Sequence, residues 1–123
     1  MSKVTILVGL PGSGKTYYGK NLAKSKPNSI LIDDPKALDS IFNALVSYEN
    51  VIIADPNLCR PEYRNTAEKI LSPNITWVFW ENNPKKAWEN VKNRDERIIS
   101  ESYVKMLSKV YKPPWVNFPV FND

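Results

Sequence analysis

The sequence predicts an α/β fold in which about four parallel strands form one sheet between helices. Short apolar runs rich in β-branched residues alternate with segments whose apolar residues recur at helical spacing. A complete G-x-x-x-x-G-K-[ST] motif joins the first apolar run to the first helical segment. Polar clusters follow the first three runs, at the strand ends where open parallel sheets bind ligands. At 123 residues, the chain (1–123) is expected to form a single domain.

The first strand is expected over residues 3–8, and residues 9–16 then read Gly-Leu-Pro-Gly-Ser-Gly-Lys-Thr. A helix is expected from 15 to about 26, so the motif has the strand–loop–helix setting of a phosphate-binding loop. Its glycines let backbone N–H groups approach a phosphate at the positive end of the helix. Lys15 is expected to reach the β- and γ-phosphates, and the Thr16 hydroxyl to hold Mg²⁺.

ATP and Mg²⁺ are therefore the expected cofactors, although the motif does not separate ATP from GTP. The residues expected to contact the nucleotide are Gly9, Pro11, Gly12, Ser13, Gly14, Lys15, Thr16 and Tyr17.

The second strand is expected over residues 29–32 and the third over 51–54. Between them, apolar residues recur at helical spacing from 38 to 45. Pro35 suits the first turn of that helix, with Asp34 as its N-cap.

The second half of the chain continues the alternation. A fourth strand is expected over residues 75–80, after a helix from 61 to about 71. Two further helices are expected, from 84 to about 92 and over 101–111. The tail, residues 112–123, carries three prolines and is expected to be extended.

Composition bounds the class of protein. With 42% hydrophobic and 24% charged residues, the chain resembles an ordinary soluble globular protein. No apolar run approaches the ~20 residues that cross a bilayer, and no signal peptide precedes the first strand. Cys59 is the only cysteine, which excludes an intrachain disulfide and a Cys-based zinc site. A cytoplasmic setting, with no membrane partner, is expected.

Charge bears on the partners and on the chemistry. The net charge of +4 favours an anionic partner such as nucleic acid about as much as it reflects simple solubility. The chain has no histidine, so a general base acting near neutral pH is expected to be a carboxylate.

Three aspartates follow predicted strands. Asp55 ends an apolar strand, which is the position of a Walker B carboxylate that contacts Mg²⁺. The alternative is that Asp55 is an N-cap or turn residue before Pro56. Asp33 and Asp34 follow the second strand, and one of them is the best candidate for the base that accepts a hydroxyl proton. Asp34 is then the helix cap, although both residues could be capping residues.

Basic residues cluster at two places. Arg94 and Arg97 lie within a polar stretch (93–100) and, at i and i+3, share one helical face. They are expected to close over the triphosphate as a lid that neutralises transition-state charge, unless they form a solvated face. Other cations could meet an acceptor phosphate or be ordinary surface residues: Lys36, Arg60 and Arg64.

The aromatic residues are more ambiguous, because they could stack bases or simply pack in the core or the tail. They are Tyr17, Tyr18, Trp115, Phe118 and Phe121.

Up to about Pro114, the order of these elements resembles the kinase domain of phage polynucleotide kinase and its P-loop relatives. Residues 4–16 look like the family's ATP loop, and Asp33-Asp34 lies where the family has an acidic pair. The resemblance implies that Asp33 is the general base. Residues 51–62 resemble an aspartate-x-asparagine-leucine stretch, which implies acceptor or metal contacts by Asp55 and Asn57.

The closing part is also similar, with Asn93 and Arg97 in the place of the lid and the helix around Val104 to Leu107 after it. The fold expected on this basis is a three-layer P-loop NTPase-type sheet in the order 2-3-1-4, with a small arginine-bearing lid. The chain departs from the family where Lys36 replaces an arginine that grips the substrate phosphate bidentately. The family's phosphatase domain is absent, which implies a smaller or more open acceptor pocket.

The resemblance thus implies a kinase that transfers the γ-phosphoryl group of ATP to a hydroxyl of a nucleic acid. The implied acceptor is a 5′-hydroxyl end or a hydroxymethyl pyrimidine in DNA, as in related phage kinases that act on hydroxymethyluracil. The residues expected to contact the acceptor are Asp34, Lys36, Asp55, Asn57, Arg60 and Arg64. A phage-encoded protein in the host cytoplasm fits this interpretation. Two alternatives stay open: a kinase of nucleotides or other small molecules, and a non-catalytic ATP-binding module.

Overall fold

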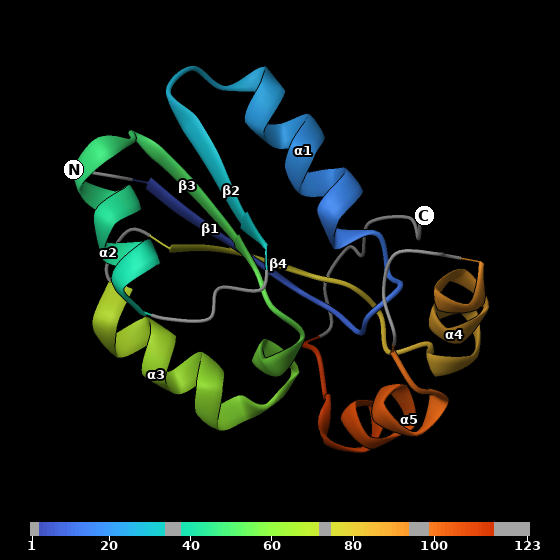
Figure 1. Cartoon of the computed structure of the whole chain (residues 1–123). Helices are drawn as coiled ribbons and strands as arrows, with labels where there is room; N and C mark the ends of the chain where they lie inside the picture. The colour runs from blue at the N-terminus through green and yellow to red at the C-terminus, as the bar shows by residue number, and fades with distance from the viewer. Residues whose placement is uncertain (1–2, 34–37, 72–74, 94–98, 115–123) are drawn as a thin grey trace.

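Four parallel strands form the sheet, in the order β2-β3-β1-β4 (Figure 1). The computed structural model describes residues 3–33, 38–71, 75–93 and 99–114. The strands are β1 (Lys3–Val8), β2 (Ser29–Asp33), β3 (Asn50–Ala54) and β4 (Ile75–Phe79). The predicted α/β class and strand order are therefore confirmed.

Helices cover both faces of this sheet (Figure 1). One short helical turn interrupts the alternation of strands and α-helices. The α-helices are α1 (Lys15–Ser25), α2 (Leu38–Ser47), α3 (Pro61–Leu71), α4 (Pro84–Lys92) and α5 (Glu101–Val110). A 3-10 helix that the sequence analysis did not anticipate, η1 (Pro56–Cys59), follows β3. It forms because Pro56 suits its first position and the Asp55 carboxylate accepts the Asn57 N–H at 2.9 Å.

Successive side chains along a strand point to opposite faces of the sheet, which assigns each residue to one face. In the register of the sheet, Ile6 lies between Ile53 and Trp77, on one face, whereas Leu7 points to the other. Gly19 of α1 lies directly against Leu7 and Leu31, so α1 covers that second face. Figure 1 shows α2 and α3 on the opposite side of the sheet from α1. The central strand β1 is fully buried after Lys3, as expected for a parallel sheet covered on both sides.

The predicted element boundaries differ from the structure by a residue or so. β2 includes Asp33, and β4 ends at Phe79 although the Trp80 N–H still donates to the Val8 carbonyl at 2.8 Å. The expected cap at Asp34 and Pro35 lies outside the described residues, as does the tail after residue 114. None of the helices in the described segments is long and apolar enough to cross a membrane.

Tyr111, at the end of α5, joins the carboxyl ends of the two strands β1 and β4. Its buried hydroxyl is hydrogen-bonded to the Trp80 carbonyl and lies 3.1 Å from the Val8 carbonyl. Burial raises the pKa of the Tyr111 hydroxyl well above its usual range, so the group keeps its proton and remains a donor. The Asn82 amide adds a bond to the Tyr111 carbonyl at 2.9 Å. These bonds fix α5 at the edge of the sheet where β1 ends and the phosphate-binding loop begins.

We expect Tyr111→Phe to lower the free energy of unfolding by about 1–2 kcal/mol, because it leaves the buried Trp80 carbonyl without this donor. Tyr63→Phe is the matched control, since Tyr63 is 47% exposed, and it should change stability by less than about 0.5 kcal/mol. Urea unfolding followed by tryptophan fluorescence measures both. Equal midpoints for the two variants would show that the Tyr111 hydroxyl contributes nothing.

Candidate functional site: a phosphate-binding loop at the carboxyl end of the sheet

The loop between β1 and α1 has the backbone that an anion site requires. Gly12 and Gly14 have φ angles of 89° and 97°, in the left-handed region that favours glycine. Gly14 is the N-cap of α1 and has no side chain to cap the helix. The first N–H groups of α1 therefore stay directed at the loop, at the positive end of the helix dipole.

Lys15 lies inside this loop. Its side chain is buried, and its ammonium donates to the Gly9 carbonyl at 2.7 Å and to the Leu10 carbonyl at 3.0 Å. These bonds hold a positive charge beside the loop amides. The contact of Lys15 with phosphate stays a prediction.

The Ser13 side chain provides a test of whether a phosphate fits. Ser13 is fully buried, and its Oγ has no hydrogen-bond partner among the described residues, a state that only Trp80 Nε1 shares there. Leaving such a group unpaired costs about 1–3 kcal/mol. A phosphate oxygen held by the loop would accept a hydrogen bond from the Ser13 hydroxyl, so these residues fit a nucleotide.

Thr16 and Asp33 meet beside the loop. Thr16 lies in the first turn of α1 and Asp33 ends β2, and the Thr16 hydroxyl donates to Asp33 Oδ2 at 2.6 Å. Because its proton is directed at the carboxylate, the Thr16 oxygen keeps its lone pairs for another partner, such as a metal ion. Two residues that lie 17 positions apart in the sequence thereby form one polar group at the end of the sheet.

Asp55 lies at the end of the adjacent strand β3, whose last residue Ala54 is in register with Asp33. Its Oδ1 caps η1, so the turn role considered from the sequence is observed. A carboxylate accepts several bonds at once, and capping therefore leaves capacity for Mg²⁺. The metal role of Asp55 stays a prediction, and Asn57 is held next to it in η1.

In the described part of the chain, no group of three or more histidine, cysteine or acidic side chains could hold a metal ion by itself. Mg²⁺ at this site would instead be bound by Thr16, by one or two carboxylates and by nucleotide phosphates, as is usual for that ion in phosphoryl-transfer sites.

The two arginines that flank the start of α3 have different surroundings. Arg64 donates from Nη1 to the carbonyls of Leu58 and Cys59, at 2.8 and 3.0 Å, and its guanidinium lies 5.7 Å from the centre of the Phe79 ring. It therefore stabilises η1. Among the described residues, the one partner that the structure shows for the Arg60 guanidinium is the Met106 sulfur of α5, at 3.6 Å.

Burial raises the pKa of the nearby Cys59 thiol to about 11, so this thiol is inert near neutral pH.

Several predicted residues lie outside the described segments, and their roles stay predictions: Asp34, Lys36, Arg94, Arg97, Trp115, Phe118 and Phe121. Of the other aromatic candidates, Tyr17 is 55% exposed beside Thr16. Tyr18 packs edge-on against Trp80, with ring centres 5.2 Å apart, and so belongs to the core around the loop.

Helix α4 supplies contacts that the sequence analysis missed. The Asn90 amide donates to the Gly12 carbonyl at 2.8 Å. A Cβ atom on Gly12 would lie 2.2 Å from the Ala87 carbonyl oxygen and 2.9 Å from the Val91 side chain. Ala87, Asn90 and Val91 share one face of α4, which the i, i+3, i+4 spacing indicates. The spacing could not have identified the loop as the partner of that face.

Comparison with known proteins supports the fold. The sequence matches no protein-family model. It is 29% identical over 102 residues to an uncharacterized protein of Acanthamoeba polyphaga mimivirus, a match that covers 76% of this chain and 74% of that protein.

Solved structures with a similar fold include the following two. A gluconokinase from Sinorhizobium meliloti 1021 superposes with a TM-score of 0.68 and 17% identity, over 93% of this chain and 77% of its own. A chain of the Pnkp1/Rnl/Hen1 RNA repair complex gives a TM-score of 0.73 and 17% identity, over 89% of this chain and 44% of its own, so this chain spans less than half of it. At this identity the likeness shows the fold, an α/β fold resembling P-loop kinases.

We expect Gly12→Ala to lower the free energy of unfolding by about 2–4 kcal/mol. Alanine is strained in the left-handed backbone conformation of Gly12, and its Cβ would clash with the Ala87 carbonyl of α4. Gly19→Ala is the control, because its new Cβ would meet the end of the Leu31 side chain at 2.8 Å. That side chain can move, and improved helix propensity offsets the strain by about 1 kcal/mol. Urea unfolding should separate the variants. Equal losses of stability would contradict the close packing of Gly12 against α4.

Proposed function

We propose that the protein is an ATP- and Mg²⁺-dependent kinase that transfers the γ-phosphoryl group to a hydroxyl of a nucleic acid. The observation that carries the proposal is the hydrogen bond between Thr16 in the phosphate-binding loop and Asp33 at the end of β2. It places a carboxylate next to the expected positions of metal and phosphate. The likeness to a gluconokinase and to a chain of an RNA repair complex supports phosphoryl transfer.

ATP would be bound by the loop from Gly9 to Thr16. The unpaired Ser13 hydroxyl and the Lys15 ammonium would donate to phosphate oxygens. Mg²⁺, held by Thr16 and Asp55, would neutralise charge on the phosphates when bound. Arg94 and Arg97 are proposed to add positive charge from the lid during transfer.

Asp33 is proposed to accept the proton of the acceptor hydroxyl. In the transfer, the acceptor oxygen forms a bond to the γ-phosphorus while the bond from that phosphorus to the β–γ bridging oxygen breaks, and ADP leaves. The proton passes to the Asp33 carboxylate. A carboxylate has lone pairs for several bonds, so Asp33 can keep Thr16 oriented while it accepts this proton.

Two observations support a nucleic-acid acceptor: the net charge of +4 and the likeness to a chain of an RNA repair complex. The proposed acceptor is a 5′-hydroxyl end or a hydroxymethyl pyrimidine in DNA. Arg60 is better placed than Arg64 to meet its phosphates, since the Arg64 guanidinium already donates to two carbonyls. Asp34, Lys36 and Asn57 are the further proposed contacts.

A small-molecule acceptor is the second candidate. The gluconokinase likeness favours it, because the match covers 93% of this chain and 77% of the gluconokinase chain.

A transfer assay with γ-labelled ATP and Mg²⁺ separates these acceptors. We expect label on single-stranded oligonucleotides with 5′-hydroxyl ends, or on duplex that contains hydroxymethyluracil and has blocked ends. Label found only on gluconate, nucleosides or nucleotides would favour the second candidate. Tight ATP binding with no label on any acceptor would indicate a non-catalytic ATP-binding module.

Substitution tests the proposed base. We expect Asp33→Asn to lower kcat by about 10²–10⁴-fold, because the amide accepts the Thr16 hydrogen bond but cannot take a proton. Affinity for a fluorescent ATP analogue should stay nearly unchanged. Asp39→Asn, an exposed position on α2, is the matched control and should keep wild-type kcat. Recovery of Asp33→Asn at high Mg²⁺ would instead assign Asp33 to metal positioning, and unchanged transfer would exclude it as the base.

A further inference from the structure

The positive charge of the protein is concentrated on α4, α5 and the residues that follow each of them. Residues 84–93 and 99–114 contain six lysines and two glutamates, a net charge of +4. The other described residues contain six lysines and two arginines against seven acidic residues, a net charge of +1. An anionic partner would therefore be attracted to the α4–α5 side of the molecule.

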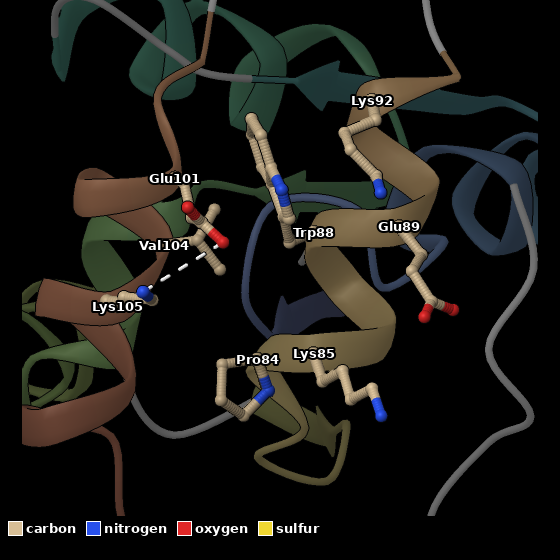
Figure 2. Close-up of a pocket in the computed structure, with 8 residues that line it drawn as sticks. All are labelled: Pro84, Lys85, Trp88, Glu89, Lys92, Glu101, Val104 and Lys105. Carbon is tan, nitrogen blue, oxygen red and sulfur yellow. Dashed lines mark ion pairs between the residues drawn. The ribbon is translucent and has the colours of Figure 1, made fainter.

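A groove of about 420 Å³ lies between these two helices. Lys85 and Lys92 line it from α4, and Lys105 lines it from α5. Figure 2 shows the Trp88 indole standing between the helices, with the Lys105–Glu101 pair on the α5 side and Lys92 on the α4 side. Trp88 is half-buried, so part of its ring is accessible to a ligand.

The cations in this groove are available to a ligand. The Lys105 ammonium lies 3.9 Å from Glu101 Oε2, and the two side chains are 64% and 51% exposed. An ion pair this exposed contributes little free energy, so a phosphate can replace Glu101 as the partner of Lys105. Lys85 and Lys92 are also exposed.

The groove is separate from the phosphate-binding loop. Ala87, Asn90 and Val91 of α4 lie against or close to Gly12, whereas Lys85, Trp88 and Lys92 line the groove. On a helix with 3.6 residues per turn, the centres of these two sets lie about 140° apart around the axis. A ligand in the groove would therefore not compete with a nucleotide in the loop.

We propose that the α4–α5 groove binds a single-stranded nucleic acid, with a base stacked on Trp88 and backbone phosphates bound by Lys85, Lys92 and Lys105. An aromatic ring among lysines is the combination that binds single strands without regard to sequence. A duplex keeps its bases stacked inside and cannot use Trp88. Glu89 and Glu101 also line the groove and can accept hydrogen bonds from base amino groups. The inference rests on the proposed function, since it assigns a second contact surface to an acceptor that is a single strand.

Binding is measured in the absence of nucleotide, by fluorescence anisotropy of a labelled oligonucleotide of about ten nucleotides. The double variant Lys92→Gln/Lys105→Gln should weaken binding at least about tenfold and reduce the slope of log K against log salt by about 1.4, or 0.7 for each lost phosphate contact. Lys20→Gln/Lys24→Gln on α1 is the control, because it makes the same change in net charge at exposed positions outside the groove. It should weaken binding less than about threefold.

Trp88 is tested separately. Trp88→Leu should weaken binding by about 5- to 100-fold with the salt slope unchanged, because stacking is lost and no phosphate contact changes. Trp88→Phe should keep most of the affinity, and this rescue distinguishes stacking from a loss of fold. An unaltered affinity of each variant for a fluorescent ATP analogue reports that the loop is intact.

Four outcomes would overturn the groove assignment: no binding by the wild-type protein, equal losses in the two lysine double variants, equal affinity for duplex or polyglutamate, or displacement of the strand by an ATP analogue. Each is distinguishable from failure of the proposed function. Strand binding that depends on the groove, together with label only on small molecules in the transfer assay, would retain the groove and reject the nucleic-acid acceptor.

Discussion

The site depends on the packing of the phosphate-binding loop against helix α4. At Gly12 the backbone is left-handed and lies so close to the Ala87 carbonyl that no side chain fits between them. The Asn90 amide then holds the Gly12 carbonyl at 2.8 Å. These contacts fix the curl of the loop from outside, and a curled backbone of this kind is what an anion-binding loop requires. The requirement for glycine here thus comes from tertiary packing as well as from the left-handed backbone.

The other side of the loop is fixed by the carboxyl ends of three strands. Tyr111 joins the ends of β1 and β4 through the Val8 and Trp80 carbonyls. Asp33 joins the end of β2 to α1 through Thr16. Because parallel strands end at one edge of the sheet, these bonds place a buried ammonium, an unpaired hydroxyl and a carboxylate within one small region. Preorganised groups of this kind stabilise developing charge without reorganisation.

Local patterns in the sequence predicted most of the fold. The apolar runs gave strand limits within about one residue of those observed, since each run lies between residues that stop a strand, such as Gly9 after Val8. The motif likewise located Lys15 and Thr16. Contacts between distant segments could not be found in this way: nothing around Asn90 indicates that it reaches Gly12, 78 positions away. The η1 turn was missed because a single Asp-Pro-Asn step predicts a cap and a turn equally well.

If both proposed sites are occupied, helix α4 would let a chain of 123 residues bind two anionic groups at separate places. Its inner face is small and apolar apart from Asn90, which suits contact with the loop backbone. Another side of the helix contributes Lys85, Trp88 and Lys92 to the lining of the groove. The same helix would thus hold Gly12 on one side and the strand on the other, provided that the strand binds where the charge and the indole place it.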